Sequence, residues 1–186
     1  MITCTEPLAT DVYAGALFFS PERADEVLHA WCEWTATAPA ETTSVARIMR
    51  FGDGHEVADM VRGRSYVLVE AVHLGSEAEG AAVLQPLREL RAELDTFSIV
   101  PPAALGHLHM EPEQPVARLA DDGFVRSLPA EAIDALVAAA APPLATVELR
   151  HAPGGFFTHA SGMPTDAAST VAIEAQLALV AGALAG

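Results

Sequence analysis

The chain has 186 residues, 51% of them hydrophobic, and its 25 Asp and Glu residues outnumber 10 basic residues, all of them Arg, for a formal net charge of -15. This length and hydrophobicity are typical of a single folded domain over residues 1–186 and exclude a disordered chain. The negative charge would be repelled by phosphate backbones and anionic lipids, so we expect no nucleic-acid partner and no membrane partner.

Cysteine content and hydropathy favour a cytoplasmic protein. The two cysteines, Cys4 and Cys32, cannot form a disulfide framework, and we expect both thiols to be free. Acidic residues interrupt the weak apolar pattern near the amino terminus, so no signal peptide is predicted. The most apolar stretch, residues 167–185, is mostly alanine and contains a glutamate and a glutamine, which argues against a transmembrane helix.

Residues 12–100 predict the element order β-α-β-β-α-β, which is the ferredoxin-like unit. Strands are predicted at residues 12–19, 44–51, 65–75 and 96–100, and helices at residues 20–34 and 76–94. The first helix has Ser20 as its N-cap and Pro21 at its first position. The second begins with Ser76 and Glu79 in capping-box spacing, and Pro86 should kink or divide it.

The second half predicts β-α-β-β-α, the same unit without its last strand. Strands are predicted at residues 124–128, 145–150 and 156–161, and helices at residues 129–141 and 164–185. Thr165 or Asp166 would cap the last helix. The fold class is therefore α+β: two ferredoxin-like β-α-β-β-α units merge into one mainly antiparallel sheet, with the helices on one face and the other face open.

The strand alternation predicts which residues lie on the open face. In the segment ATVELR, Glu148 and Arg150 share one face while the apolar residues between them share the other. By the same alternation Glu70 lies on the open face of a central strand together with Tyr66 and Leu68. An uncovered sheet face needs a partner, a ligand or polar side chains.

Four segments, VYAGALFF, VLVEAVHLG, LGHLHMEPEQPV and VELRHAPGG, together resemble the substrate-binding domain of FAD-linked oxidoreductases of the berberine bridge enzyme type. The resemblance runs in the family's order from Val12 to the last predicted helix. It implies a domain that forms the roof over the flavin, with the open sheet face lining a pocket for apolar polycycles, alkaloids or sugars.

The resemblance does not include the family's flavin domain or its carboxy-terminal segment. The sequence has no G-x-G-x-x-G pattern and no P-loop, and its one adjacent glycine pair lies in VELRHAPGG. We therefore expect no cofactor bound by this chain itself, and FAD only if a separate flavin-domain protein supplies it.

The candidate catalytic residues are charged groups on the predicted open face. Glu148 is a candidate general base, and Arg150 would favour its ionised form and orient an anion or a carbonyl. Glu70 is an alternative base, and His109, from the proline-bound loop, could move the proton. The alternative is that Glu148 and Arg150 form a surface ion pair that contributes little.

Five residues are candidates for substrate binding: Tyr66, Leu68, Phe157, His159 and Glu111. His107, His109 and Glu111 also have the chemistry of a zinc site. The resemblance places them in a pocket-lining loop without a metal, so no metal is predicted. Trp31 and Trp34 are interpreted as packing residues of the first helix.

Three functions remain open. The chain could be a flavin-free protein that binds an apolar small molecule and catalyses a cofactor-independent cyclisation or isomerisation. It could be the substrate-binding part of an FAD-dependent oxidoreductase whose flavin domain is elsewhere. It could also be a non-catalytic homodimer that covers apolar residues of the open face, Tyr66 and Leu68 among them, with its own copy.

Overall fold

The computed structural model describes residues 11–54, 57, 59–110, 118–125, 128–140, 144–151 and 171–178. The strands are β1 (Val12–Phe19), β2 (Thr42–Arg50), β3 (Ser65–His73), β4 (Leu94–Asp95), β5 (Ser98–Val100), β6 (Arg118–Val125), β7 (Leu144–His151) and β8 (Val171–Ala178). The α-helices are α1 (Ala24–Thr35), α2 (Glu77–Arg88) and α3 (Ala130–Ala139), and the 3-10 helices are η1 (Pro21–Arg23) and η2 (Pro102–His107). Within these ranges no helix has the length and apolar character needed to cross a membrane.

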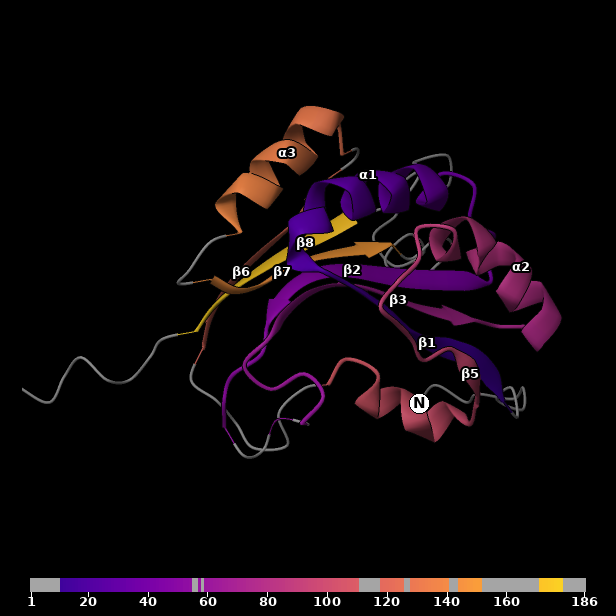
Figure 1. Cartoon of the computed structure of the whole chain (residues 1–186). Coiled ribbons are helices and arrows are strands. Elements are labelled where there is room, and N and C mark those ends of the chain that lie inside the picture. Colours follow the sequence, from indigo (N-terminus) through magenta and orange to yellow (C-terminus); the bar gives the residue numbers. More distant parts are fainter. Residues whose placement is uncertain are drawn as a thin grey trace, which may run out of the picture.

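The strands form one curved sheet with α1, α2 and α3 on the same side of it (Figure 1). The strand order is β4-β1-β3-β2-β7-β8-β6, β5 also pairs with β1, and every strand pair is antiparallel. The α+β class and the mainly antiparallel sheet are thus confirmed. The order β1-β3-β2 is mirrored by β6-β8-β7, and the two halves join along β2 and β7. The composition from two ferredoxin-like units stays a prediction.

Local signals of the sequence explain where the helices begin and end. The capping box predicted at the start of α2 is present: the Ser76 side chain accepts from the Glu79 backbone, and the Glu79 side chain accepts from the Ser76 backbone. Pro86 lies in the last turn of α2 and does not divide the helix, which ends at Arg88 instead of continuing to residue 94. Pro86 lacks the N–H group that would bond the carbonyl four residues earlier, so its effect is confined to the turn before it.

The helix predicted over residues 164–185 is wrong where the structure describes it, because Val171–Ala178 is strand β8. The segment VAIEAQLA has Val, Ile, Ala and Leu at every second position, with Glu and Gln between some of them, so a period of two was present among alanines that favour a helix. Pairing with β7 on one side and β6 on the other decides the outcome. The predicted strand at 156–161 lies outside the described residues.

The helix side of the sheet holds the larger apolar core. Trp31 is fully buried, and its indole nitrogen donates to Ser44 Oγ at 2.9 Å. Trp34 is buried as well and donates to the Val83 carbonyl at 2.8 Å, so the packing role predicted for both tryptophans is confirmed. At Gly80 of α2 a Cβ atom would overlap the Tyr13 ring, so this glycine lets α2 approach β1 closely.

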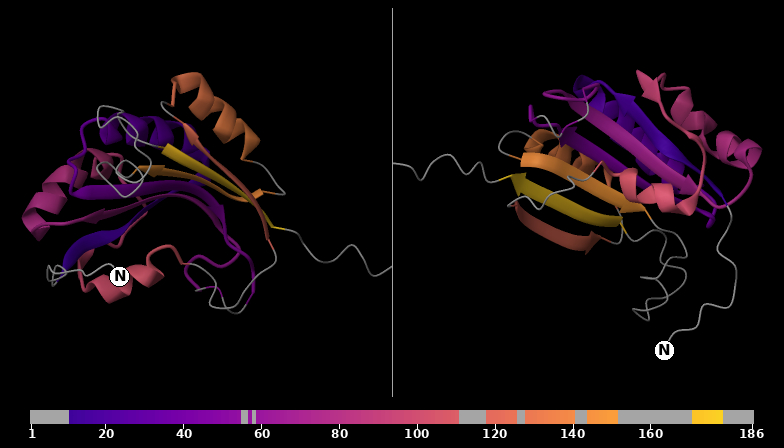
Figure 2. Two further views of the ribbon diagram at one scale, coloured as in Figure 1. Left: turned by 180° about the vertical axis from the view of Figure 1, so that it is seen from behind. Right: turned by 90° about the horizontal axis from the view of Figure 1, so that it is seen from below.

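The opposite side of the sheet is not open over β1 and β3, in contrast to the prediction. Residues 101–110, which include η2, lie on that side (Figure 2), and the segment after β2 contributes Phe51 and Val61. Phe51, Val61 and Phe18 form a second apolar cluster with Tyr66 and Leu68. Tyr66 and Leu68 do lie on the predicted face, but they are buried under the chain's own residues and supply no exposed apolar surface for a dimer.

Candidate functional site

A buried group of charged residues lies on the sheet side opposite the helices, where the two halves of the sheet meet. Arg47 of β2 is directly opposite Glu148 of β7 in the strand register. Glu70 of β3 is opposite Val45 and therefore diagonal to Arg47. Arg47, Glu70 and Glu148 are 2%, 1% and 3% exposed, so three ionisable side chains are withdrawn from water together.

Arg47 connects the two carboxylates. Its Nη2 forms an ion pair with Glu70 Oε1 and donates to the backbone carbonyl of His109 at 3.0 Å. Its Nε lies 3.9 Å from Glu148 Oε2. A buried carboxylate needs such compensation, because the energy lost on leaving water is recovered only with charge partners and hydrogen bonds.

Glu148 is held between two arginines. Its Oε1 contacts Arg150 Nε, and its Oε2 faces Arg47. The shared face predicted for Glu148 and Arg150 is confirmed, and so is their ion pair. However, only the Arg150 side of the pair is exposed, with 45% of that side chain accessible, whereas Glu148 is buried.

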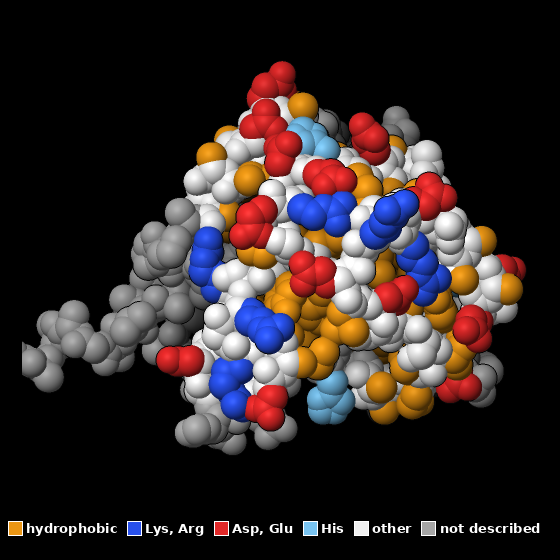
Figure 3. All heavy atoms as spheres, in the orientation of Figure 1, with side chains coloured by type: hydrophobic (Ala, Val, Ile, Leu, Met, Phe, Trp, Pro, Cys, Tyr) orange, Lys and Arg blue, Asp and Glu red, His pale blue; other side chains and the backbone are white. Residues whose placement is uncertain are grey.

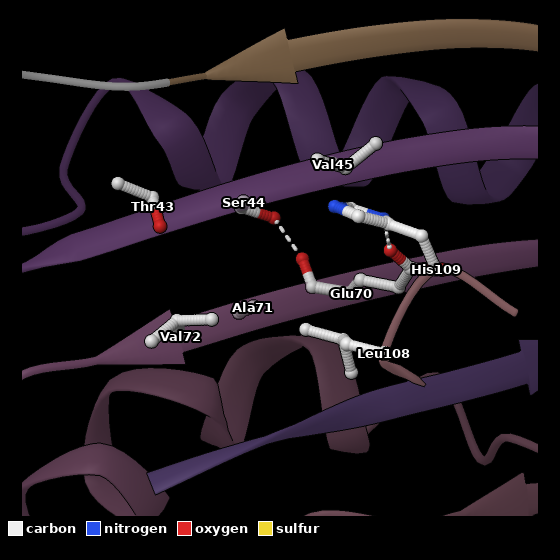
Figure 4. Close-up of a pocket in the computed structure, with 8 residues that line it drawn as sticks. All are labelled: Thr43, Ser44, Val45, Glu70, Ala71, Val72, Leu108 and His109. Carbon is white, nitrogen blue, oxygen red and sulfur yellow. Dashed lines mark hydrogen bonds and ion pairs between the residues drawn. The ribbon is translucent and has the colours of Figure 1, made fainter. Parts of the chain in front are cut away.

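Glu70 has a different environment, since its second oxygen faces a histidine and not an arginine among the described residues. Glu70 Oε2 contacts His109 Nδ1, and the His109 side chain is 36% exposed. A cavity of about 60 Å³ lies beside this pair (Figure 4). Its lining residues are Thr43, Ser44, Val45, Glu70, Ala71, Val72, Leu108 and His109. Glu70 Oε2 and His109 Nδ1 are both buried and face each other, so a polar group of a ligand in the cavity would compete for this contact.

The backbone at Glu70 is fixed from the helix side. Ser44 Oγ donates to the Glu70 carbonyl at 2.7 Å and accepts from the Trp31 indole. These buried bonds tie β3 to β2 and α1 at the position of Glu70. The main chain that carries the candidate base is thereby held in place by the core.

The structure brings together four of the predicted site residues: Glu70, Glu148, Arg150 and His109. Phe157, His159 and Glu111 lie outside the described residues. Arg47 was missed. The available signal was an arginine in the strand SVARIMRF, on the same alternating face as Val45 and Met49. Its partners on β3 and β7 are not apparent from the local pattern.

Among the described residues, two further side chains have a pKa that is shifted mainly by burial. Burial raises the pKa of the Cys32 thiol, and the charge of Glu33 adds to this, so this free cysteine has little of the thiolate form that reacts. Burial lowers the pKa of His151, whose ring nitrogens have no hydrogen-bond partner among the described residues. Neither residue belongs to the charged group around Arg47.

Helices α1, α2 and α3 follow Arg23, Ser76 and Pro129, and none of these three helices begins after a glycine-rich turn of the kind that holds a pyrophosphate. The expectation that this chain binds no cofactor by itself stays a prediction.

Solved structures similar in fold were found, although no protein-family model and no curated protein matches the sequence. A variant of berberine bridge enzyme aligns with a TM-score of 0.60 and 14% identity over 91% of this chain and 36% of that chain. Physcomitrella patens BBE-like 1 aligns with a TM-score of 0.65 and 12% identity over 94% of this chain and 40% of that chain. A Bermuda grass pollen isoallergen of group 4 aligns with a TM-score of 0.66 and 12% identity over 96% and 39%.

These alignments confirm the predicted resemblance to berberine bridge enzyme and BBE-like proteins at the level of the fold. The chain spans 36% to 40% of the length of those three proteins, which is consistent with a partial domain. At these identities the likeness shows the fold alone, and any common chemistry has to be argued from this chain's own residues.

Proposed function

We propose that this chain is the substrate-facing part of an FAD-linked oxidoreductase of the berberine bridge enzyme type, with Glu70 as the group that accepts a proton from the substrate. The observation that carries the proposal is the buried Glu70 carboxylate, which has one oxygen paired to Arg47 and the other beside a cavity and an imidazole. The fold likeness supports the family. The flavin would supply the redox chemistry and would be held outside the described residues.

Glu70 is better placed for this role than Glu148. Both oxygens of Glu148 face arginines, so a proton on this group would have to displace a charge partner. Glu70 Oε2 contacts only His109 among the ion pairs of the described residues. The partly exposed imidazole offers a route by which a proton taken from the substrate reaches solvent.

The cavity volume sets the size of the group that Glu70 can reach. About 60 Å³ corresponds to roughly two water molecules, whereas pockets for whole drug-sized ligands measure about 300 to 1,000 Å³. The cavity therefore suits one polar group, such as a hydroxyl, with the rest of an apolar substrate outside it. One of the similar structures is a berberine bridge enzyme variant in complex with (S)-reticuline, which gives a first compound to try.

The test is a ligand screen followed by one matched pair of variants. Aromatic hydroxyl compounds, (S)-reticuline included, are screened by thermal shift, and turnover of each ligand is measured with an added FAD-loaded flavin-domain protein. Glu70→Gln keeps the shape of the side chain but removes its charge. We expect it to retain binding and to lose about 100-fold or more in kcat, as loss of a positioned base does.

Glu89→Gln, at an exposed position after α2, is the control and should turn over normally. Full activity of Glu70→Gln would overturn the assignment of the base. Full activity of Glu70→Gln together with loss of activity in Glu148→Gln would transfer the role to Glu148.

A second candidate function is a flavin-free isomerisation or cyclisation. The observation in its favour is that a carboxylate and an imidazole in contact suffice for proton transfer without a redox cofactor. Flavin-free protein under anaerobic conditions separates the two functions. Conversion of the ligand to an isomer would support the second, and conversion only after flavin is supplied would support the first. Neither function requires the homodimer, which stays a prediction.

A further inference from the structure

A second group of ligating side chains lies on the helix side of the sheet, away from Arg47 and its carboxylates. Asp25 and His29 are one turn apart on α1, and Asp134 projects from α3. Acidic side chains and a histidine gather over these two helices at the top of the surface in Figure 3. The group is outside the proposed catalytic site, so the inference below does not depend on the proposed function.

The three side chains converge on one point. His29 Nε2 lies 2.8 Å from Asp134 Oδ1 and 3.5 Å from Asp25 Oδ1, and one ligand atom from each residue lies within 4.8 Å of the others. Ligands bound to one zinc ion at about 2.0 to 2.2 Å are separated by about 3 to 3.5 Å, so little movement is needed for all three to bind the same ion.

The charges at this point are not balanced by the imidazole. A neutral His29 with its proton on Nε2 can donate to Asp134, but Asp25 at 3.5 Å is then left with a poor hydrogen bond. One ring nitrogen of His29 therefore cannot serve both carboxylates. A divalent cation would neutralise both carboxylates at once, and the net charge of -15 favours the approach of any cation.

We propose that Asp25, His29 and Asp134 form a binding site for a divalent transition metal, with zinc as the best-suited ion, that joins α1 to α3. One imidazole nitrogen and two carboxylate oxygens are ligands that zinc accepts, and the imidazole disfavours magnesium and calcium. The three side chains are 69%, 31% and 60% exposed in the order given, so water can complete the coordination and the ion can enter without any opening of the fold.

The site could not be predicted from the sequence. His29 and Asp134 are 105 residues apart, and the spacing of Asp25 and His29 alone is common on exposed helix faces. Only the packing of α3 beside α1 brings the third ligand to the other two.

The experiment is a calorimetric titration of the tag-free, metal-stripped full chain with zinc chloride. We expect one binding event that weakens by about 10-fold or more in each of His29→Gln, Asp25→Asn and Asp134→Asn, since even the loss of an outer-shell partner has an effect of that size in metal sites. His107→Gln, at an exposed histidine outside the group, is the matched control and should bind as the parent does.

A second measurement makes the result independent of folding defects. Zinc should raise the melting temperature of the parent chain in a concentration-dependent way and should not raise that of His29→Gln, whose metal-free melting temperature and circular dichroism are recorded first. Absence of zinc binding by the parent chain would reduce the group to a hydrogen-bonded contact between helices. Unchanged zinc affinity in all three ligand variants would place the metal on other residues. Either result would overturn the proposal.

Discussion

The two faces of the same sheet are buried by different means. On the helix side, an apolar core that includes Trp31, Leu17 and Val69 packs under α1 and α2, together with buried hydroxyl and imidazole side chains such as Ser44 and His73. On the other side, a smaller apolar cluster adjoins the buried charges of Arg47, Glu70 and others. Successive residues of a strand point to opposite faces, so β2 and β3 contribute to both environments.

The difference suggests a division of roles between the faces. Apolar packing stabilises a fold without requiring particular partners, whereas a buried ion pair stabilises little relative to apolar residues of the same size and is strongly destabilising when one member is removed. Three buried charges on one face therefore indicate a role other than stabilising the fold. In our proposal that role is proton transfer at Glu70.

The largest effect is expected from a cavity on the helix side. Trp31→Ala removes a fully buried indole and leaves Ser44 Oγ without its donor. We expect the free energy of unfolding to fall by about 3 to 5 kcal/mol, with a further contribution of about 1 kcal/mol from the lost hydrogen bond. Urea denaturation of the variant and the parent measures this. A loss below about 1 kcal/mol would contradict the assignment of the main core to the helix side.

On the charged face, the effect of replacing Arg47 should depend on whether its carboxylate partners are still present. Arg47→Leu leaves the carboxylates of Glu70 and Glu148 buried without their shared guanidinium, and we expect a loss of about 3 to 5 kcal/mol in urea denaturation. Combining Arg47→Leu with Glu70→Leu and Glu148→Leu should recover most of this loss, because no charge then remains buried. Equal instability of the single and the triple variant would show that Arg47 acts through packing and not through charge.

The helix side also contains a buried histidine, His151, at the end of β7. Burial lowers its pKa below the ordinary value of 6.5, so between these values the unfolded chain binds more protons than the folded chain. Stability should therefore be fully present above about pH 6.5 and should decrease as the pH falls from there toward the folded pKa. Comparing urea midpoints at about pH 7 and about pH 5 in the parent and in His151→Phe tests this, with the variant expected to lose less. His107→Gln is the control, and an identical pH dependence in His151→Phe would contradict the prediction.

The smallest effect is expected from an ion pair at the surface. Arg88 Nε lies 2.8 Å from Asp95 Oδ2, with the two side chains 24% and 38% exposed. Because water screens the pair, Asp95→Asn should lower the free energy of unfolding by less than about 1 kcal/mol. Comparison with Arg47→Leu separates the effect of burial from the effect of charge. Similar losses of unfolding free energy in Asp95→Asn and Arg47→Leu would show that burial does not determine the size of the loss.

The sequence by itself determined the local features of the fold. The alternation in β3 and β7 placed Tyr66, Leu68 and Glu70 on one face, and Glu148 with Arg150, as the structure has them. The order β1-α1-β2-β3-α2-β5, without the two-residue strand β4, and the capping box of α2 also follow from short-range patterns. These succeed because side-chain direction and helix capping depend on residues only a few positions apart.

Only the tertiary structure decided which of these residues meet. The pairing of β2 with β7 brings Arg47 opposite Glu148, the segment ending at Met110 covers a face predicted to be open, and Val171–Ala178 is a strand because β6 and β7 are available on both sides. The contact of His29 with Asp134 likewise depends on two helices far apart in the chain. Strand register and helix packing are set by contacts between distant segments, which override local propensity and have no signature within any short stretch of sequence.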